Sequence, residues 1–237
     1  MSGLHDDQIP REIDPECGLP IGPALLRSGP AKNPQRIVLN GRYCRLEPLD
    51  PKSHGDDLYS ASMPPDSTAR FRYLPECAPT SMHEFSEWMV AAAKSKDPLF
   101  FAVIDKRSGR VEGRQSLMRI TPLHQCIEIG HIYWGPSISQ SRVATEANFL
   151  FSRYVFEDLG YRRYEWKCDA LNVPSRRAAL RFGFRYEGHF RRATIVRGRS
   201  RDTAWFSIID EEWPLLKSAY EKWLAPENFD ADGKQKH

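Results

Sequence analysis

One stretch of the sequence, Glu128 to Ala147 (EIGHIYWGPSISQSRVATEA), constrains the fold more than any other. Its first half is an apolar run typical of a buried strand. Its second half begins an amphipathic helix, and a short polar turn lies between them. Such a turn places backbone N–H groups and the positive end of the helix dipole at one point. The sequence therefore predicts a phosphate or pyrophosphate site where this strand meets the helix.

The rest of the chain predicts consecutive strands first, and then strands that alternate with helices. The expected strands are 36–46 (a pair with a turn at Asn40-Gly41), 99–105, 111–120, 127–134, 164–168, 184–196 and 203–209. The expected helices are 51–63, 81–94, 144–159, 174–182 and 211–224. This order predicts an α/β (α+β) fold with a mixed, mostly antiparallel sheet of about seven strands, helices on both faces and a parallel or splayed central pair. It does not fit a doubly wound nucleotide fold, and no G-x-G-x-x-G or P-loop motif occurs.

Proline sets the expected domain limits. The first 36 residues contain Pro10, Pro15, Pro20, Pro23, Pro30 and Pro34, which forbid a long helix or a central strand. We therefore expect an irregular arm over 1–36, one domain over 37–224, and a polar, frayed tail over 225–237.

Charge and cysteine content narrow the function. A net charge of +3 is too small to demand a nucleic-acid partner. The five cysteines are scattered without a C-x-x-C pair, so we expect reduced thiols, with neither a disulfide framework nor a metal site. No apolar run is long enough for a bilayer, and the N-terminus lacks a signal-peptide pattern. We therefore expect a cytoplasmic protein with no membrane partner.

Four segments resemble the GNAT N-acetyltransferase superfamily, in particular its RimJ/RimL-like branch. They are GHIYWGPSISQSRVATEA, RRYEWKCDALNVPSRRAALRFGFRYEG, FFAVIDKRSGRVEGRQSL and RYCRLEPL. The second is the most specific, because Asn172, Ser175, Gly183 and Phe184 fall in register with the anion loop upstream. Together the segments place the resemblance over residues 36–212.

The resemblance implies that the protein transfers an acetyl group from acetyl-CoA to a primary amine by direct attack. The amine would belong to a small molecule or to a protein N-terminus, and a second copy of the chain is a further candidate partner. The pantetheine arm would pair with Ile132, Tyr133 and Trp134, much like an added strand. The remaining implied contacts to the co-substrate are Ser139, Gln140, Ser141, Arg142, Val143, Ala144, Thr145, Asn172 and Arg176.

The anion loop departs from the family pattern Gln/Arg-x-x-Gly-x-Gly/Ala, because Ser139, Arg142 and Ala144 stand at its defined positions. In one interpretation, the loop hydroxyls and amides bind the pyrophosphate and Arg142 adds a charge-assisted contact. In the other, the serines only cap a helix and Arg142 is a solvated residue of its first turn.

Acetyl transfer needs a neutral amine, donors for the oxyanion and an acid for the thiolate. By the family pattern Glu128 is the general base, acting through water, although it could instead be a strand carboxylate in an ion pair. His131 is the rival base. Strand alternation puts Glu128 and His131 on opposite faces unless a bulge intervenes. Ser175 is the candidate donor to the thiolate, with a helix cap as its alternative.

The remaining candidates have alternatives of the same kind. Backbone N–H groups near Tyr133 and Trp134 are candidate donors to the thioester carbonyl. Glu187 could face the acceptor amine, although a strand ion pair is the simpler interpretation. Trp134, Trp166 and Tyr186 could line an acceptor pocket, but aromatic residues on strands more often belong to the core.

Two other classes of protein stay open. The altered loop is compatible with a catalytically silent acyl-CoA sensor on the same fold. The hairpin 184–209 is basic and could bind nucleic acid. Its arginines are Arg185, Arg191, Arg192, Arg197, Arg199 and Arg201. Because aromatic residues are sparse there and acidic residues flank it, a solvated hairpin without a nucleic-acid partner is favoured.

Overall fold

The computed structural model of the protein describes residues 9–25 and 29–236. The chain divides into two compact units, Met1–Pro30 and Ala31–His237. Within the first unit, β1 (Glu12–Ile13) and β2 (Pro20–Ile21) form a short antiparallel pair, so the segment expected to be irregular contains a small hairpin. The domain limits at residues 36 and 224 stay predictions.

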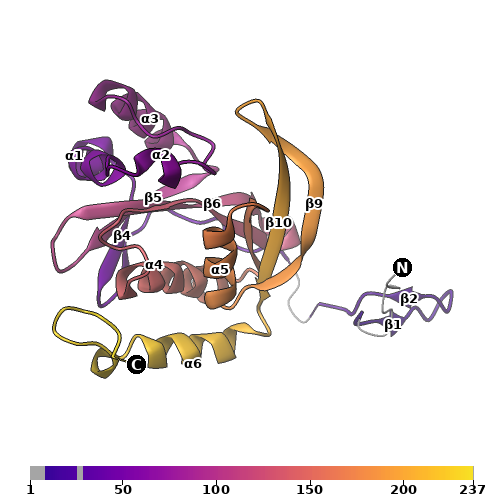
Figure 1. Cartoon of the computed structure of the whole chain (residues 1–237). Coiled ribbons are helices and arrows are strands. Elements are labelled where there is room, and N and C mark those ends of the chain that lie inside the picture. Colours follow the sequence, from indigo (N-terminus) through magenta and orange to yellow (C-terminus); the bar gives the residue numbers. More distant parts are fainter. Residues whose placement is uncertain (1–8, 26–28, 237) are drawn as a thin grey trace. The chain divides into compact units, whose positions relative to one another are not determined.

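The second unit is built on one eight-stranded sheet in the order β3-β4-β5-β6-β7-β8-β10-β9 (Figure 1). All neighbouring strands pair antiparallel except β7 and β8, which are parallel. The strands are β3 (Leu39–Asn40), β4 (Cys44–Pro48), β5 (Leu99–Asp105), β6 (Val111–Thr121), β7 (Cys126–Trp134), β8 (Arg163–Asp169), β9 (Arg185–Val196) and β10 (Arg199–Ile209). The mixed, mostly antiparallel sheet expected from the sequence is confirmed.

Helices cover both faces of the sheet. In Figure 1, α1, α2 and α3 lie on one side of it, and α4, α5 and α6 lie on the other. Their bounds are α1 (Pro51–Ser62), α2 (Ser67–Arg70), α3 (Met82–Lys94), α4 (Arg142–Arg153), α5 (Val173–Arg181) and α6 (Trp213–Trp223). Short α2 was not expected, because Pro64-Pro65 indicated a loop. No helix among the described residues is long and apolar enough to cross a bilayer.

The apolar residues form one cluster on each face of the sheet. On the α4 side, Val143, Ala147 and Phe151 pack against strand residues such as Ile127 and Ile129. On the α1 side, Leu58 and Met89 from α1 and α3 pack against β5 residues such as Phe100. Strand alternation therefore decides which side chains reach which cluster, and it places the intervening polar residues of β7 and β8 on the α1 side.

Glu146 joins α4 to the start of β4. This buried carboxylate accepts three successive backbone N–H groups, from Arg42 at 2.7 Å, Tyr43 at 2.6 Å and Cys44 at 2.7 Å. A Cβ on Gly41 would overlap the Glu146 carboxylate in its present position, so a larger residue there would displace this carboxylate. The contact orients the first turns of α4, and hence the predicted anion site, relative to the sheet.

The C-terminal segment is ordered, which corrects the expectation of a frayed tail. Phe229 is 5% exposed and packs against Tyr43 and Trp223. A short 3-10 turn (Pro226–Asn228) and a bridge between Phe229 and Gln235 give the segment its shape. Its composition is polar, but one aromatic side chain is enough to dock it.

Candidate active site

The sheet opens between its two parallel strands. The pairing of β7 with β8 runs from Cys126–Arg163 to Ile129–Trp166, and among the described pairs none joins the two strands beyond that point. The rest of β7 keeps its other neighbour, β6, up to Trp134. Beyond that point the facing edges of β7 and β8 do not pair with each other, and we call the space between these two edges the slot. The splayed central pair expected from the sequence is confirmed.

A β-bulge interrupts β7 at this fork. Ser116 pairs with Gly130 and Arg114 pairs with Tyr133, so two residues of β7, His131 and Ile132, lie opposite one residue of β6. His131 has a φ of 49°, in the left-handed region. The bulge reverses the alternation: Ile129 belongs to the core under α4, whereas the Tyr133 hydroxyl donates to the Ala61 carbonyl of α1.

Glu128 and His131 therefore lie on the same face of the sheet. The neighbours of Glu128, Ile127 and Ile129, face α4, so Glu128 faces the other way. The His131 ring packs edge-on against Phe100, which belongs to the apolar cluster of the α1 side. Simple alternation would separate the two candidate bases, and the bulge that the sequence left open brings them together.

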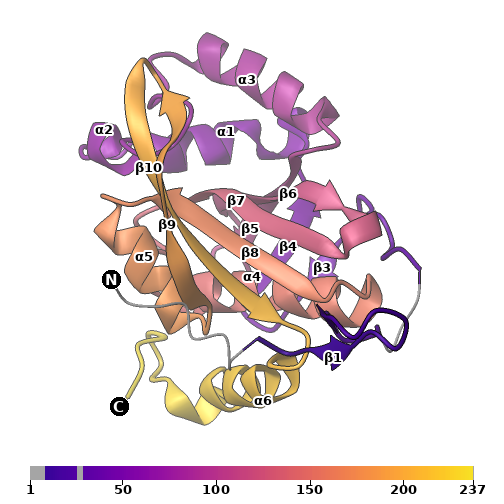
Figure 2. The ribbon, with the colours of Figure 1, turned by 90° about the vertical axis from the view of Figure 1, so that its right-hand side faces the viewer.

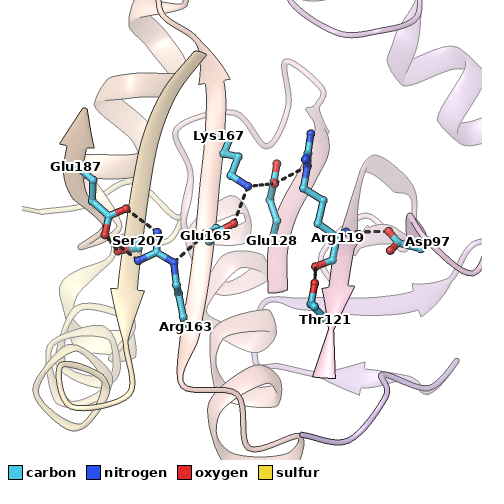
Figure 3. A network of polar contacts seen from close by, with 9 residues as sticks. All are labelled: Asp97, Arg119, Thr121, Glu128, Arg163, Glu165, Lys167, Glu187 and Ser207. Carbon is cyan, nitrogen blue, oxygen red and sulfur yellow. Dashed lines mark hydrogen bonds and ion pairs between the residues drawn. The ribbon is translucent and has the colours of Figure 1, made fainter. Parts of the chain in front are cut away.

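Alternating charges from four strands, β6, β7, β8 and β9, run across this face (Figure 3). We call this row the charge ladder; in order its members are Arg119, Glu128, Lys167, Glu165, Arg163 and Glu187. Glu128 lies at the fork, 3.1 Å from both Arg119 Nε and Lys167 Nζ. At the far end, Glu187 accepts hydrogen bonds from Arg163 and from the Ser207 hydroxyl. Its carboxylate therefore forms an ion pair with Arg163 of a nearby strand.

The two candidate bases differ in ionisation. Burial raises the pKa of Glu128, and the cations Lys167 and Arg119 oppose that rise. Burial lowers the pKa of His131 to about 4, helped by the nearby Arg114 guanidinium. His131 is therefore neutral near pH 7 and a weak proton acceptor, whereas the Glu128 carboxyl titrates closer to neutrality than an ordinary glutamate.

Arg114 holds the bulge from the α1 side, and the sequence did not single it out. Its side chain is 1% exposed; it donates to the His131 carbonyl at 2.7 Å and pairs with Glu76. The guanidinium lies 4.4 Å from the centre of the Trp88 ring. Burial lowers the pKa of Arg114 to about 9. Glu76 comes from the segment between α2 and α3, where no sequence pattern pointed to a site.

The tip of the β9–β10 hairpin contacts the segment between α2 and α3. Figure 2 shows the hairpin extending from the sheet toward α2. Arg197, at the tip, donates to the backbone carbonyl of Arg72 and lies 3.3 Å from the Cys77 sulfur. The basic hairpin thus uses one of its exposed arginines to contact the segment between α2 and α3. A solvated hairpin was the favoured expectation, and its exposed residues Arg191 and Arg192 fit it.

The start of α4 offers the predicted anion donors. Ser141 caps the helix and accepts the Val143 N–H at 3.1 Å. In the described hydrogen-bond network, the N–H groups of Gln140, Arg142 and Ala144 have no acceptor. Gln140 has a φ of 59°, so this turn contains a residue in the left-handed conformation although that residue is not a glycine. Several free N–H groups at a helix N-terminus are suited to phosphate oxygens.

Arg142 points away from this turn, which neither interpretation of the loop anticipated. Its guanidinium lies 4.4 Å from the centre of the Tyr43 ring and 5.3 Å from that of Phe229. Two other arginines reach the turn instead. Arg70 of α2 lies 3.5 Å from the Ser139 hydroxyl, and Arg181 of α5 donates to the Thr145 hydroxyl at 3.2 Å.

The downstream candidates cap and support α5. The Asn172 side chain accepts the Ser175 N–H at 3.1 Å, and Arg176 lies 3.3 Å from the Ala170 carbonyl. The Ser175 hydroxyl accepts the Trp166 indole N–H at 3.0 Å and also faces the Cys168 thiol. Ser175 therefore lies directly against the β8 edge of the slot.

The aromatic candidates divide between core and surface. Trp134 packs edge-on against Trp166 and Phe182. Trp166 belongs to the buried core, and Trp134 is partly buried against it. Tyr186 is 47% exposed and rests on Phe206. The described residues contain no group of three or more His, Cys, Asp or Glu side chains arranged to hold a metal ion.

Known proteins are similar to this chain in fold and in sequence. The family model "Acetyltransferase (GNAT) domain" matches residues 44–185. A GCN5-related N-acetyltransferase structure from Brucella melitensis is 59% identical, covers 90% of this chain and 96% of its own, and has a TM-score of 0.88. A probable GNAT-family acetyltransferase from Chromobacterium violaceum is 34% identical, covers 83% and 98%, and has a TM-score of 0.76.

A curated Bacillus subtilis protein named "Uncharacterized N-acetyltransferase YnaD" is 29% identical over 86 residues. That alignment covers 36% of this chain and spans half the length of the relative. The splayed sheet and the two nearly full-length structural relatives define an acyltransferase fold. The chain belongs to the GNAT acetyltransferase family, and it is an acyltransferase.

Proposed function

We propose that the protein transfers an acetyl group from acetyl-CoA to a primary amine, by direct attack of the amine on the thioester. The observation that carries this proposal is the position of Glu128 at the fork of β7 and β8, on the face opened by the His131–Ile132 bulge. A thioester in the slot would meet a buried carboxylate on one side and free backbone N–H groups of β7 on the other. Those are a base and an oxyanion donor.

Glu128 is the proposed base. An acceptor amine arrives as an ammonium and must lose a proton before it can attack, and a carboxylate whose pKa is raised takes that proton near neutral pH. Water relays the proton if the amine does not touch the carboxylate. His131 has the wrong pKa for this role, because burial lowers it to about 4. We propose instead that the neutral His131 ring contacts the acceptor without exchanging a proton with it.

The turn before α4 is the proposed pyrophosphate site. The free N–H groups at residues 140, 142 and 144 support it, together with the Ser139 and Thr145 hydroxyls. We assign the cationic contacts to Arg70 and Arg181, because they already touch these hydroxyls. Arg142 keeps only a backbone role, since its side chain is engaged by Tyr43 and Phe229. The pantetheine arm would then run along Ile132, Tyr133 and Trp134.

Ser175 is the proposed donor to the departing thiolate. Its oxygen accepts from Trp166, which leaves its own O–H as a donor. The hydroxyl lies near the Cys168 thiol and would donate to the sulfur of the co-substrate. Asn172 supports the role by capping the turn that carries Ser175. Arg176, exposed on α5, would reach a phosphate group.

The acceptor class and location extend this proposal. The GF-x-x-E-G segment, Gly183 to Gly188, supports the RimJ/RimL-like branch, and with it a small-molecule amine or a protein N-terminus as acceptor. A homodimer is the proposed assembly. Five free cysteines support a reducing compartment, for which we propose the cytoplasm.

The test is release of coenzyme A thiol from acetyl-CoA in the presence of a panel of primary amines. We expect release with at least one amine, and mass addition of one acetyl group to that amine. Thermal stabilisation by acetyl-CoA without turnover on any amine would instead favour the silent sensor. A nucleic-acid shift at low salt that disappears at high salt would favour a role for the basic hairpin.

A further inference from the structure

Lys167 occupies a position in the site that the proposed reaction does not yet use. Its side chain is 7% exposed, and its ammonium lies 3.1 Å from Glu128 and 2.7 Å from Glu165. The ammonium also lies 3.7 Å from the centre of the Trp205 ring. A lysine is rarely this buried unless its charge is matched. Two carboxylates hold one cation at the point where β7 and β8 separate (Figure 3), and the Trp205 ring lies against the same cation.

The two carboxylates are direct partners across the strands. Glu128 and Glu165 are opposite each other in the parallel register of β7 and β8. Two buried carboxylates at that spacing raise each other's pKa unless a cation lies between them. The ion pair of Lys167 with both residues supplies that cation.

The other charged neighbours of Glu128 act more weakly. Arg119 of β6 reaches it at 3.1 Å, but its side chain is 57% exposed and water screens it. His131, on β7, is neutral near pH 7 because burial lowers its pKa to about 4. Trp205 of β10 carries no charge. Lys167 is therefore the buried cation that acts most on Glu128.

We propose that Lys167 is a positioning residue for the acyl transfer: its ammonium, shared between Glu128 and Glu165, keeps Glu128 ionised and fixed at the fork. This inference rests on the proposed function, in which Glu128 accepts the proton of the amine. Burial favours the protonated carboxyl, which cannot act as a base. The Lys167 ammonium lowers the pKa of Glu128 and so favours the carboxylate, whereas the negative charge of Glu165 raises that pKa and favours the protonated form.

Substitutions at these two neighbours therefore shift Glu128 in opposite directions. Lys167→Met keeps the apolar stem and removes the charge, so the midpoint of Glu128 ionisation rises by about 1 to 3 pH units. Glu165→Gln removes the second carboxylate and leaves Lys167 to Glu128 alone, so the midpoint falls. Lys167→Arg keeps a cation and holds the midpoint near that of the wild type. If the charge ladder were purely structural, Lys167→Met and Glu165→Gln would lose stability but would not move the midpoint of Glu128 ionisation in opposite directions.

The measurement is an NMR titration of the Glu128 carboxyl carbon in protein with isotope-labelled glutamate, with Glu128→Gln to assign the signal. The acidic limb of the kcat/KM profile should move with the midpoint. Because the titration needs no turnover, the two failures can be told apart: a wild type without acetyl transfer overturns the proposed function, whereas the titration alone decides whether Lys167 keeps Glu128 ionised. An unchanged midpoint in folded Lys167→Met, or a rise in Glu165→Gln, overturns that role. If Lys167→Met does not fold, Glu165→Gln and Lys167→Arg carry the test.

Discussion

The guanidinium of Arg142 lies 4.4 Å from the centre of the Tyr43 ring, at the first position of α4. Phe229 of the C-terminal segment lies on the same guanidinium, at 5.3 Å. The residue that replaces the loop glycine of the family is therefore bound to the C-terminal segment. It joins that segment to the helix whose N-terminus would hold the pyrophosphate.

Replacing Arg142 with alanine should loosen the C-terminal segment and leave affinity for coenzyme A within about threefold of the wild type. Two cation–aromatic contacts are lost, which costs about 1 kcal/mol of stability at a partly exposed site. Calorimetric titration and a thermal melt check the two effects. A loss of affinity of about tenfold or more would return Arg142 to the phosphate site.

Replacing Arg70 or Arg181 with alanine should weaken coenzyme A binding by about tenfold each, because each substitution removes a charge-assisted contact to phosphate. The effect should shrink as salt is added. Arg177→Ala, an exposed arginine on the same helix as Arg181, is the matched control and should bind normally. If all three variants bound coenzyme A with equal affinity, Arg70 and Arg181 would not contact the phosphates, and the pyrophosphate site would have to lie elsewhere.

Replacing Glu146 with glutamine should destabilise the fold by about 2 to 4 kcal/mol, because one of the two oxygens that accept three backbone N–H groups becomes a donor. Chemical denaturation measures the loss. Glu211→Gln, on an exposed glutamate, is the control and should change little. Wild-type stability in Glu146→Gln would mean that the turn at Gly41 does not depend on this carboxylate.

His131 should make the fold sensitive to acid. Its pKa is lowered from the ordinary 6.5 to about 4, so the folded state resists its protonation. Its contribution is complete above pH 6.5 and is lost as the pH falls toward 4; it amounts to at most about 3 kcal/mol. His131→Asn, which cannot titrate, should lose less stability between pH 7 and 4.5 than the wild type does. Parallel losses in the two proteins would remove His131 as the cause.

Apolar spacing in the sequence predicted the order of the elements, and that order predicted a parallel or splayed pair in the middle of the sheet. Apolar spacing also placed Glu128 on a strand, and its place beside the slot was what the resemblance to the GNAT family implied. The orientation of His131 could not be predicted, since a bulge depends on how β6 and β7 pair rather than on local composition. Three contributors come from distant segments without a motif: Arg70, Glu76 and Phe229. Their roles arise from tertiary packing, which a single sequence does not display.

The central claim is that Glu128, at the fork of β7 and β8, accepts the proton of the amine. Single-turnover release of coenzyme A thiol by wild type and Glu128→Gln, measured across pH with the accepted amine, tests it most directly. We expect Glu128→Gln to bind acetyl-CoA normally and to lose about 100-fold or more in rate near neutral pH. Activity of the variant should recover in part at high pH, where the amine is already neutral. A variant that turns over at the wild-type rate with an unchanged pH profile would contradict the claim.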